Sequence, residues 1–167
     1  MGELEIEGIY PLAYIQMLAG VHVQRVFART TAHFHQLYVD NHVDDLATVT
    51  LEMEQGLVGS LCLGRIGNAS HPDIGEIKLH LLGSERALVI AEARPEVGVY
   101  YRGQADTEFR NVRLANDNGW LLAENFARAI DTNGDTILNA RKSRAICATV
   151  KAAVESGRTG GPVEVSA

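Results

Sequence analysis

The chain has 167 residues, of which 46% are apolar and 22% are charged, and its formal net charge is −6. This length fits one domain with a proper apolar core. The acidic balance argues against nucleic acid as the main partner, because binding to phosphates requires a basic patch. No apolar run in the sequence is long enough to cross a bilayer, so we expect no membrane partner.

The two cysteines point to a reducing compartment. Cys62 and Cys147 lie in apolar contexts, one on a predicted strand and one on a predicted helix. Such cysteines are typically buried free thiols. We therefore expect a cytoplasmic protein without disulfides.

The opening of the chain, residues 2–20, predicts a short strand, a turn and a helix. Gly8 is the expected turn residue. Pro11 suits the first turn of the helix that follows, and Gly20 suits its end.

The middle of the chain predicts antiparallel strands joined by tight turns. A strand over residues 22–32 precedes a polar and aromatic loop over residues 33–43. The clearest signal is a hairpin, in which the alternating residues 46–53 and a second strand over 57–63 flank a turn at Gly56. Further strands are expected, in chain order, at residues 75–82, 87–91, 97–102, 109–114 and 162–165.

Two helices are predicted near the end of the chain, where the apolar spacing changes to the helical period. Asn118 can cap the first, over residues 119–131, and the second begins at Asn139 and is expected to stop at Gly157. Hairpin-linked strands followed by helices favour an α+β fold, with an open, mainly antiparallel sheet and helices on one face. No linker is visible, so residues 1–167 are expected to form a single domain.

Four stretches of the sequence form a further pattern. They are Gly2-x-Leu4-x-x-x-Gly8-Ile9-Tyr10-Pro11-Leu12, then Val43-Asp44-Asp45-Leu46 with Gly56 and Gly59-Ser60-Leu61, then Leu81-Leu82-Gly83-Ser84-Glu85, and finally Glu124-Asn125-Phe126-Ala127-Arg128-Ala129-Ile130 with Pro162-Val163. In this order and spacing they resemble the C-terminal domain of the Gfo/Idh/MocA oxidoreductase family. The match covers nearly the whole chain.

This resemblance implies an NAD(P)-dependent oxidoreductase that acts mostly on sugars and polyols and carries a Rossmann domain before the matching part. The present sequence has no Gly-x-Gly-x-x-Gly turn, so it resembles the substrate-side domain alone, with a dihydrodipicolinate-reductase-like sheet. NAD or NADP would belong to the full-length protein, and we expect no cofactor and no activity on this fragment. The implied partners are the missing Rossmann domain, a small-molecule substrate and a second copy packed through an uncovered apolar sheet face.

The same resemblance makes Tyr10 the candidate acid/base residue. Many members carry Asp-x-x-x-His on the opening turn, and alignment on Gly8 puts Ile6 at the Asp position and Tyr10 at the His position. A phenol can relay a hydroxyl proton when a nearby cation lowers its pKa, and the family's Lys would be that cation. Glu5 and Glu7 would face away on a strand. Simple packing of Tyr10 at a helix start stays an equal alternative.

His35 and Arg65 are the candidate substrate contacts. His33 and His35 would share one face of a strand, and His42 follows nearby. A polar pocket wall is favoured over a metal site, because zinc needs a further ligand and a shaped shell, and no metal is expected. Arg65 follows a predicted strand, where it can reach an anionic or polyol substrate, although a plain surface arginine is the alternative.

Two alternatives to an active enzyme stay open. The chain can be a free-standing, non-enzymatic dimerisation or ligand-binding module, which the coding sequence upstream of residue 2 would reveal. It can also belong to a pseudo-enzyme, because Ile6 replaces the expected Asp.

Overall fold

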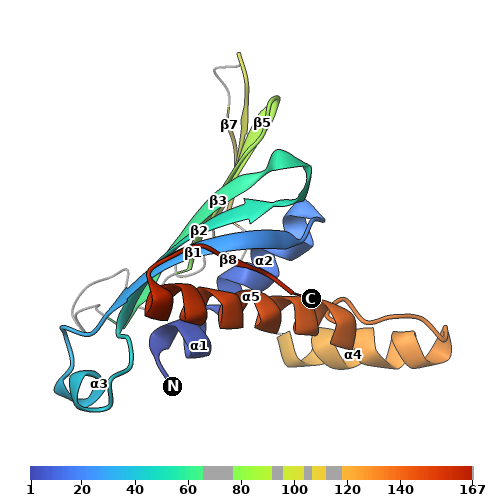
Figure 1. Ribbon diagram of the computed structural model, residues 1–167. Helices are drawn as coiled ribbons and strands as arrows, with labels where there is room; N and C mark the ends of the chain where they lie inside the picture. Colours follow the sequence, from blue (N-terminus) through green and yellow to red (C-terminus); the bar gives the residue numbers. More distant parts are fainter. Residues whose placement is uncertain (66–76, 92–95, 104–106, 112–117, 167) are drawn as a thin grey trace. The chain divides into compact units, whose positions relative to one another are not determined.

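A computed structural model describes residues 1–65, 77–91, 96–103, 107–111 and 118–166 of the chain. The chain divides into two compact units, Met1–Ile66 with Leu138–Ala167 and Gly67–Ile137. The described strands form two four-stranded antiparallel sheets and, together with the helices, confirm the expected α+β class (Figure 1). That residues 1–167 form one C-terminal domain of a longer protein stays a prediction.

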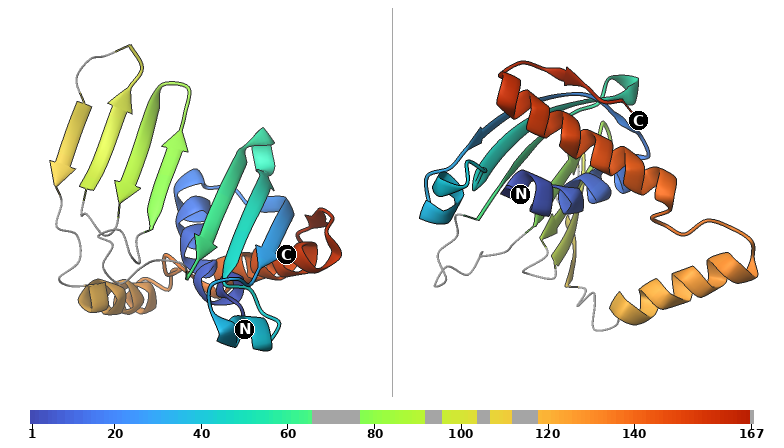
Figure 2. Two further views of the ribbon diagram at one scale, coloured as in Figure 1. Left: turned by 90° about the vertical axis from the view of Figure 1, so that its left-hand side faces the viewer. Right: turned by 60° about the horizontal axis from the view of Figure 1, so that its bottom comes forward.

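The sheet of the first unit has the strand order β3-β2-β1-β8 (Figure 2). These strands are β1 (Val23–Thr31), β2 (Leu46–Met53), β3 (Val58–Gly64) and β8 (Val163–Glu164). The predicted hairpin is confirmed, with a 3-10 turn at Glu54–Gly56 in which Gly56 adopts a φ of 75°. Along β2 the side chains of Ala47, Val49, Leu51 and Met53 are buried, whereas Thr48, Thr50 and Glu52 are exposed.

Helices cover the buried face of this sheet (Figure 2). The longest, α5 (Ala140–Thr159), begins as predicted, because the Asn139 side chain accepts a hydrogen bond from the Lys142 N–H at 2.9 Å. The expected stop at Gly157 is wrong, since the helix continues to Gly160, which has a φ of 76°. Gly157 serves close packing instead, because a Cβ there would lie 2.9 Å from the Thr30 side chain on β1.

The Ser156 side chain on α5 bonds to backbone groups at a place where β1 has no strand partner. β8 pairs only with Arg25 and Val26, so it ends before it reaches Ala28. The buried Ser156 hydroxyl accepts the Ala28 N–H at 2.8 Å and donates to the Gly161 carbonyl at 2.5 Å. The helix thus completes the hydrogen bonding of the central strand, as buried backbone groups require.

The opening of the chain differs from its prediction. Residues expected as a strand form helix α1 (Glu3–Glu7), which leads through Gly8 into α2 (Ile9–Ala19). Alternating Leu and Glu fit a strand locally, but Asp44, distant in sequence, supplies a helix cap. Its carbonyl accepts the Glu3 N–H at 2.9 Å and its carboxylate accepts the Leu4 N–H at 2.8 Å.

The end of α2 and the segment after β1 also bear on the predictions. Gly20 ends α2 as expected, with a φ of 68°. The expected loop over residues 33–43 contains a one-turn-and-a-half helix, α3 (Gln36–Asp40). This short helix carries no buried residue, which explains why no apolar periodicity marked it in the sequence.

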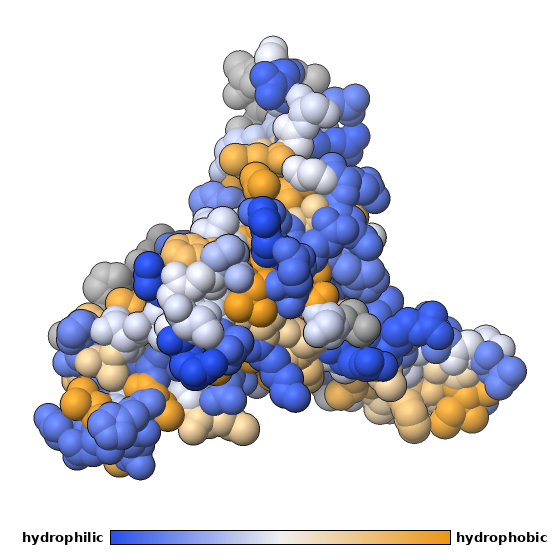
Figure 3. Space-filling view, viewed as in Figure 1, coloured by the Kyte–Doolittle hydropathy of each residue, from blue (hydrophilic) through white to orange (hydrophobic). Residues whose placement is uncertain are grey.

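The second unit holds the sheet β4-β5-β6-β7 and one long helix among its described residues. Its elements are β4 (Lys78–Leu82), β5 (Arg86–Ala91), β6 (Glu96–Tyr101), β7 (Thr107–Asn111) and α4 (Asn118–Asp131). The predictions for these elements are confirmed, except that residues 75, 76 and 112–114 of two expected strands lie outside the described residues. Hydrophobic side chains stand exposed along α4 (Figure 3), among them Trp120, Leu122 and Phe126.

The outer face of the first sheet carries polar side chains, with Thr48 and Thr50 exposed and Arg25 donating to Glu52 at 2.9 Å, so an uncovered apolar sheet face stays a prediction. The expectation of buried cysteines is wrong. Cys62 and Cys147 are free but exposed, because each follows a more deeply buried residue and points the other way. No helix in the described ranges is both long and apolar enough to span a membrane.

Candidate functional site

Three strand ends of the first unit meet at one end of its sheet. Thr31 at the end of β1 pairs with Leu46 at the start of β2, and Leu46 pairs with Gly64 at the end of β3. Asp45, which directly precedes Leu46, donates its N–H to the Thr31 carbonyl. Its own carbonyl accepts the Arg65 N–H, and both distances are 3.0 Å. The backbone of Asp45 therefore fixes the two strand ends that lead to the candidate residues.

The Asp45 side chain is fully buried and holds the loop that carries His35. Its carboxylate accepts the backbone N–H groups of His33, Phe34 and His35, at 3.0, 2.6 and 3.1 Å. Burial alone would raise the pKa of this carboxyl, but the three backbone donors hold the pKa below its usual value. Asp45 is thus a charged anchor for three consecutive residues.

Two of the three predicted site residues meet at this corner. The His35 imidazole Nε2 lies 2.6 Å from the carbonyl oxygen of Arg65. His35 is exposed, and its ring stands beside the Tyr38 ring at a centroid distance of 5.7 Å. The structure therefore brings the His35 side chain to the backbone of a residue thirty positions later in the sequence.

A buried carboxylate completes the corner. Glu3 on α1 is only 1% exposed, accepts a hydrogen bond from the Tyr38 hydroxyl and pairs with Arg65 Nε at 2.9 Å. Arg65 also reaches Glu7, at 3.4 Å. The hydrogen bond with Glu3 raises the pKa of Tyr38, and the same carboxylate raises the pKa of Arg65. The guanidinium thus faces two carboxylates, so this corner carries no excess positive charge.

Tyr10 lies on the same helix face as this cluster. Gly8 has helical dihedrals, with φ −62° and ψ −23°, and it donates to the Leu4 carbonyl at 3.2 Å, so the helical path continues from α1 into α2. Tyr10 then stands one turn after Glu7, and 51% of its surface is exposed. The expectation that Glu7 faces away is wrong, because it assumed a strand.

Ile6 also neighbours Tyr10, four residues earlier on the helix, and is 37% exposed. An apolar side chain therefore stands where the resemblance implies an Asp. Any acid/base role of Tyr10 would therefore act without the carboxylate that the resemblance implies at residue 6.

The histidines near this corner bear on the question of a metal site. Within the described ranges, no group of three or more His, Cys, Asp or Glu residues is arranged to hold a metal ion. The His33 side chain makes no part of the hydrogen-bonded cluster around Arg65, to which only its backbone N–H is linked through Asp45.

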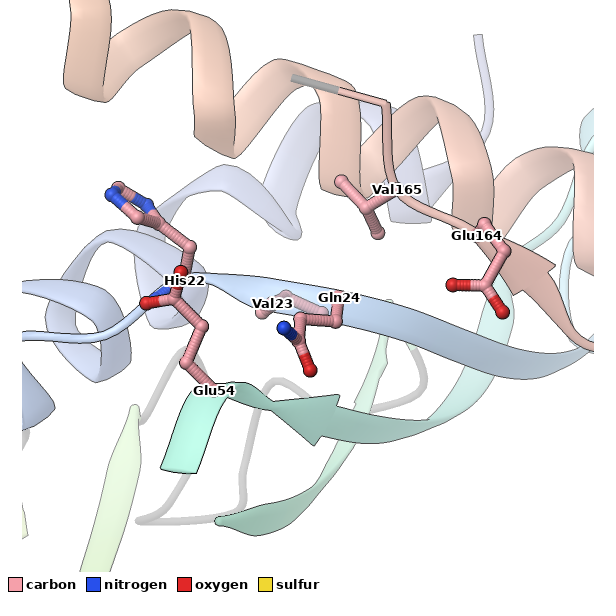
Figure 4. A pocket seen from close by; sticks show the side chains of 6 residues that line it. All are labelled: His22, Val23, Gln24, Glu54, Glu164 and Val165. Atoms are coloured by element: carbon pink, nitrogen blue, oxygen red, sulfur yellow. The ribbon is translucent and has the colours of Figure 1, made fainter. Parts of the chain in front are cut away.

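A shallow hollow lies at the opposite end of the same sheet (Figure 4). It has a volume of about 500 Å³. Its lining comes from the start of β1, the turn after β2 and the β8 end, with His22, Glu54 and Glu164 as the ionisable residues. The His22 N–H and the Glu54 carboxylate are already bonded to each other at 2.9 Å. None of the predicted site residues lines it.

Sequence reasoning missed Glu3, Tyr38 and Asp45 as members of the corner. One local signal existed: Glu3 and Glu7 are four residues apart, which places both on one face of a helix. The strand prediction hid that spacing. The partners of Tyr38 and Asp45 depend on the tertiary fold and have no local signal.

Comparison with known proteins gives the family. The model of the GFO/IDH/MocA C-terminal domain matches residues 6–89. Comparison with curated proteins finds no match. Many solved structures share the fold, and the chain spans about half the length of those it matches.

Three solved structures illustrate the likeness. An oxidoreductase domain protein from Kribbella flavida has a TM-score of 0.82 at 16% identity, with 99% of this chain and 50% of that chain covered. Levoglucosan dehydrogenase in complex with NADH has a TM-score of 0.78 at 21% identity, with 99% and 50% covered. UDP-N-acetylglucosamine 3-dehydrogenase from Acidithiobacillus ferrooxidans has a TM-score of 0.72 at 18% identity, with 90% and 46% covered. The chain belongs to the GFO/IDH/MocA C-terminal domain family.

Proposed function

We propose that this chain is the substrate-binding half of an NAD(P)-dependent oxidoreductase that acts on a hydroxyl of a sugar-like or polyol substrate. The observation that carries the proposal is the corner in which His35 and Arg65 touch and from which the Tyr10 face continues. Carboxylate, guanidinium, imidazole and phenol groups on one surface suit a ligand rich in hydroxyl groups. The similarity to levoglucosan dehydrogenase agrees with such a ligand.

The dinucleotide belongs on a partner domain in this proposal. Every strand pair that the described residues form is antiparallel. A Rossmann dinucleotide site requires parallel strands, with a Gly-rich turn at a helix N-terminus. The described residues of this chain do not fit that requirement, so the chain contributes the substrate side and the partner domain contributes the cofactor side.

Tyr10 is the proposed acid/base residue of that substrate side. It is half exposed on the helix face that carries Glu7, so a substrate hydroxyl can approach its phenol. Its role is tested in the protein encoded together with the upstream reading frame. NAD+ or NADP+ reduction is measured with a panel of sugars and polyols, and Tyr10→Phe is expected to lower kcat by about 100-fold or more. Unchanged turnover would exclude Tyr10 as the acid/base residue. Turnover by the 167-residue chain alone would refute the proposal that the cofactor binds to a partner domain.

One observation favours a pseudo-enzyme as second candidate. Ile6 neighbours Tyr10 where the resemblance implies a carboxylate. In that case the full-length protein would bind a polyol without oxidising it. Ligand binding by calorimetry together with no reduction of either dinucleotide would favour this alternative.

Self-association is also proposed, now through the second unit. The outer face of the first sheet is polar, but in the second sheet Leu81 pairs with Leu88 and Leu88 with Val99, so that these partly exposed side chains share a face. A second copy can cover this apolar face. Light scattering that shows only monomer at high micromolar concentration would contradict it.

A further inference from the structure

The His35 ring has two nitrogens with different environments. Nε2 lies 2.6 Å from the Arg65 carbonyl oxygen. A carbonyl oxygen can only accept a hydrogen bond, so Nε2 must carry a proton. In the neutral imidazole the proton on Nε2 leaves Nδ1 as a lone-pair acceptor.

Asp45 fixes both partners of this contact. Its carboxylate holds the backbone on which His35 stands, through the N–H groups of His33, Phe34 and His35. Its own carbonyl accepts the Arg65 N–H at 3.0 Å. One fully buried residue therefore sets the position of the imidazole and of the carbonyl that determines its tautomer.

The surroundings of His35 suit a neutral ligand. The charged groups of the corner are Arg65, Glu3, Glu7 and the buried Asp45, so the carboxylates outnumber the guanidinium. Tyr38 stacks beside the ring at a tilt of 43°, and its hydroxyl is committed to Glu3. The exposed His35 ring thus offers an acceptor nitrogen in a corner with no excess positive charge.

We propose that His35 is the hydrogen-bond acceptor for a ligand hydroxyl at this corner, acting through Nδ1, and that Asp45 is the positioning residue that holds its tautomer. The ligand part rests on the proposed function, whereas the tautomer part stands on the geometry alone. The Nε2–H bond to the Arg65 carbonyl holds the ring so that the Nδ1 lone pair can accept from the ligand hydroxyl, which keeps its proton.

The first experiment measures the imidazole nitrogens by 15N NMR in the chain itself. Neutral His35 is expected as the Nε2–H tautomer with a slowly exchanging Nε2–H signal, unlike His42. Asp45→Asn is expected to abolish the slow exchange and to allow both tautomers. An Nδ1–H tautomer in the wild type, or a folded Asp45→Asn chain with an unchanged His35 signal, would overturn the positioning role.

The second experiment separates the acceptor role of Nδ1 from the hydrogen bond between Nε2–H and the Arg65 carbonyl. Gln at position 35 can still donate to the Arg65 carbonyl but has no acceptor at the Nδ1 position. Asn offers an acceptor near Nδ1 but is too short to donate to the Arg65 carbonyl. In the full-length protein with levoglucosan, His35→Gln is expected to lower kcat/KM by about 10-fold through the lost hydrogen bond. It is also expected to remove the acidic limb of the pH profile, because a protonated Nδ1 cannot accept. His35→Asn is expected to keep more activity than His35→Gln.

The outcomes of the two experiments are distinguishable. His35→Gln with wild-type kcat/KM and an unchanged pH profile would overturn the acceptor role while leaving the proposed function intact. Full-length wild type that turns over none of the sugars and polyols would instead refute the proposed function. In that case, levoglucosan is added to the chain and the His35 Nδ1 signal is followed by 15N NMR. A signal that does not move would overturn the acceptor role as well.

Discussion

The pKa values of two neighbouring carboxyl groups, Asp44 and Asp45, are shifted in opposite directions. Burial raises the pKa of Asp44, and the Leu4 N–H opposes that shift only in part. Its charge therefore lowers the free energy of unfolding at neutral pH, and this cost disappears as the pH falls through the raised pKa. The pKa of Asp45 is lowered, so its charge stabilises the fold at neutral pH, and this stabilisation is lost as the pH falls through the lowered pKa.

Asn substitutions at both positions test this contrast. Asp44→Asn keeps an acceptor for the Leu4 N–H and removes the desolvated charge, so the free energy of unfolding at pH 7 is expected to be unchanged or higher. Asp45→Asn weakens three buried hydrogen bonds and is expected to cost about 2–3 kcal/mol. Urea unfolding at pH 7 and pH 4 provides the measurement. Equal losses for the two variants at pH 7 would contradict the assignment.

The Glu3–Arg65 pair is asymmetric, because Glu3 is buried and Arg65 is 56% exposed. Arg65→Met leaves a buried carboxylate with only the Tyr38 hydroxyl as side-chain donor. Glu3→Gln still accepts from Tyr38 and leaves the half-exposed Arg65 with Glu7 and water as its partners. Thermal unfolding is therefore expected to show a larger fall in Tm for Arg65→Met than for Glu3→Gln, with the double variant above Arg65→Met. The reverse order would show that the pair is not held as described.

At the scale of elements, packing and helix propensity make opposite predictions for a substitution at Gly157. Ala normally stabilises a helix interior relative to Gly by about 1 kcal/mol. At Gly157 a Cβ would lie 2.9 Å from the short Thr30 side chain, so α5 would have to move away from β1. Gly157→Ala is therefore expected to lower the Tm. The matched control is Gly119→Ala on α4, where a Cβ meets nothing within 4 Å and the Tm is expected to hold or rise.

The sequence predicted most elements because their signals are local. The 46–53 hairpin strand alternates, and residues 119–131 repeat with the helical period, so each could be assigned without tertiary information. The opening segment failed because its Leu–Glu alternation imitates a strand, while the cap that makes it a helix comes from Asp44, forty residues away. Gly157 failed because its role depends on Thr30.

The candidate site was predictable only in part, for the same reason. His35 and Arg65 were identified from their residue type and their place at strand ends, and they do touch. Tyr10 was identified from the family pattern. The buried Glu3, which is 62 residues from Arg65 in sequence, and the anchoring carboxylate of Asp45 required the folded backbone.

At the scale of the whole molecule, the two units differ in how much apolar surface they bury. Among the residues whose burial the structure describes, Leu79 is the one apolar side chain of the second unit that counts as buried, whereas the first unit buries residues on β1, β2, α1, α2 and α5. Hydrophobic burial is the main stabilising term in folding. The second sheet is therefore expected to open locally at a lower free energy than the first.

Hydrogen exchange measures this difference directly. Backbone amides of β4, β5 and β6 are expected to exchange faster than those of β2, which serves as the internal reference. If a second copy covers the apolar face of the second sheet, protection of β4–β6 rises with protein concentration while that of β2 stays constant, because association stabilises only the unit that it covers. Equal protection of both sheets in dilute solution would contradict the difference in burial, and protection independent of concentration would remove the second copy as the partner of this face.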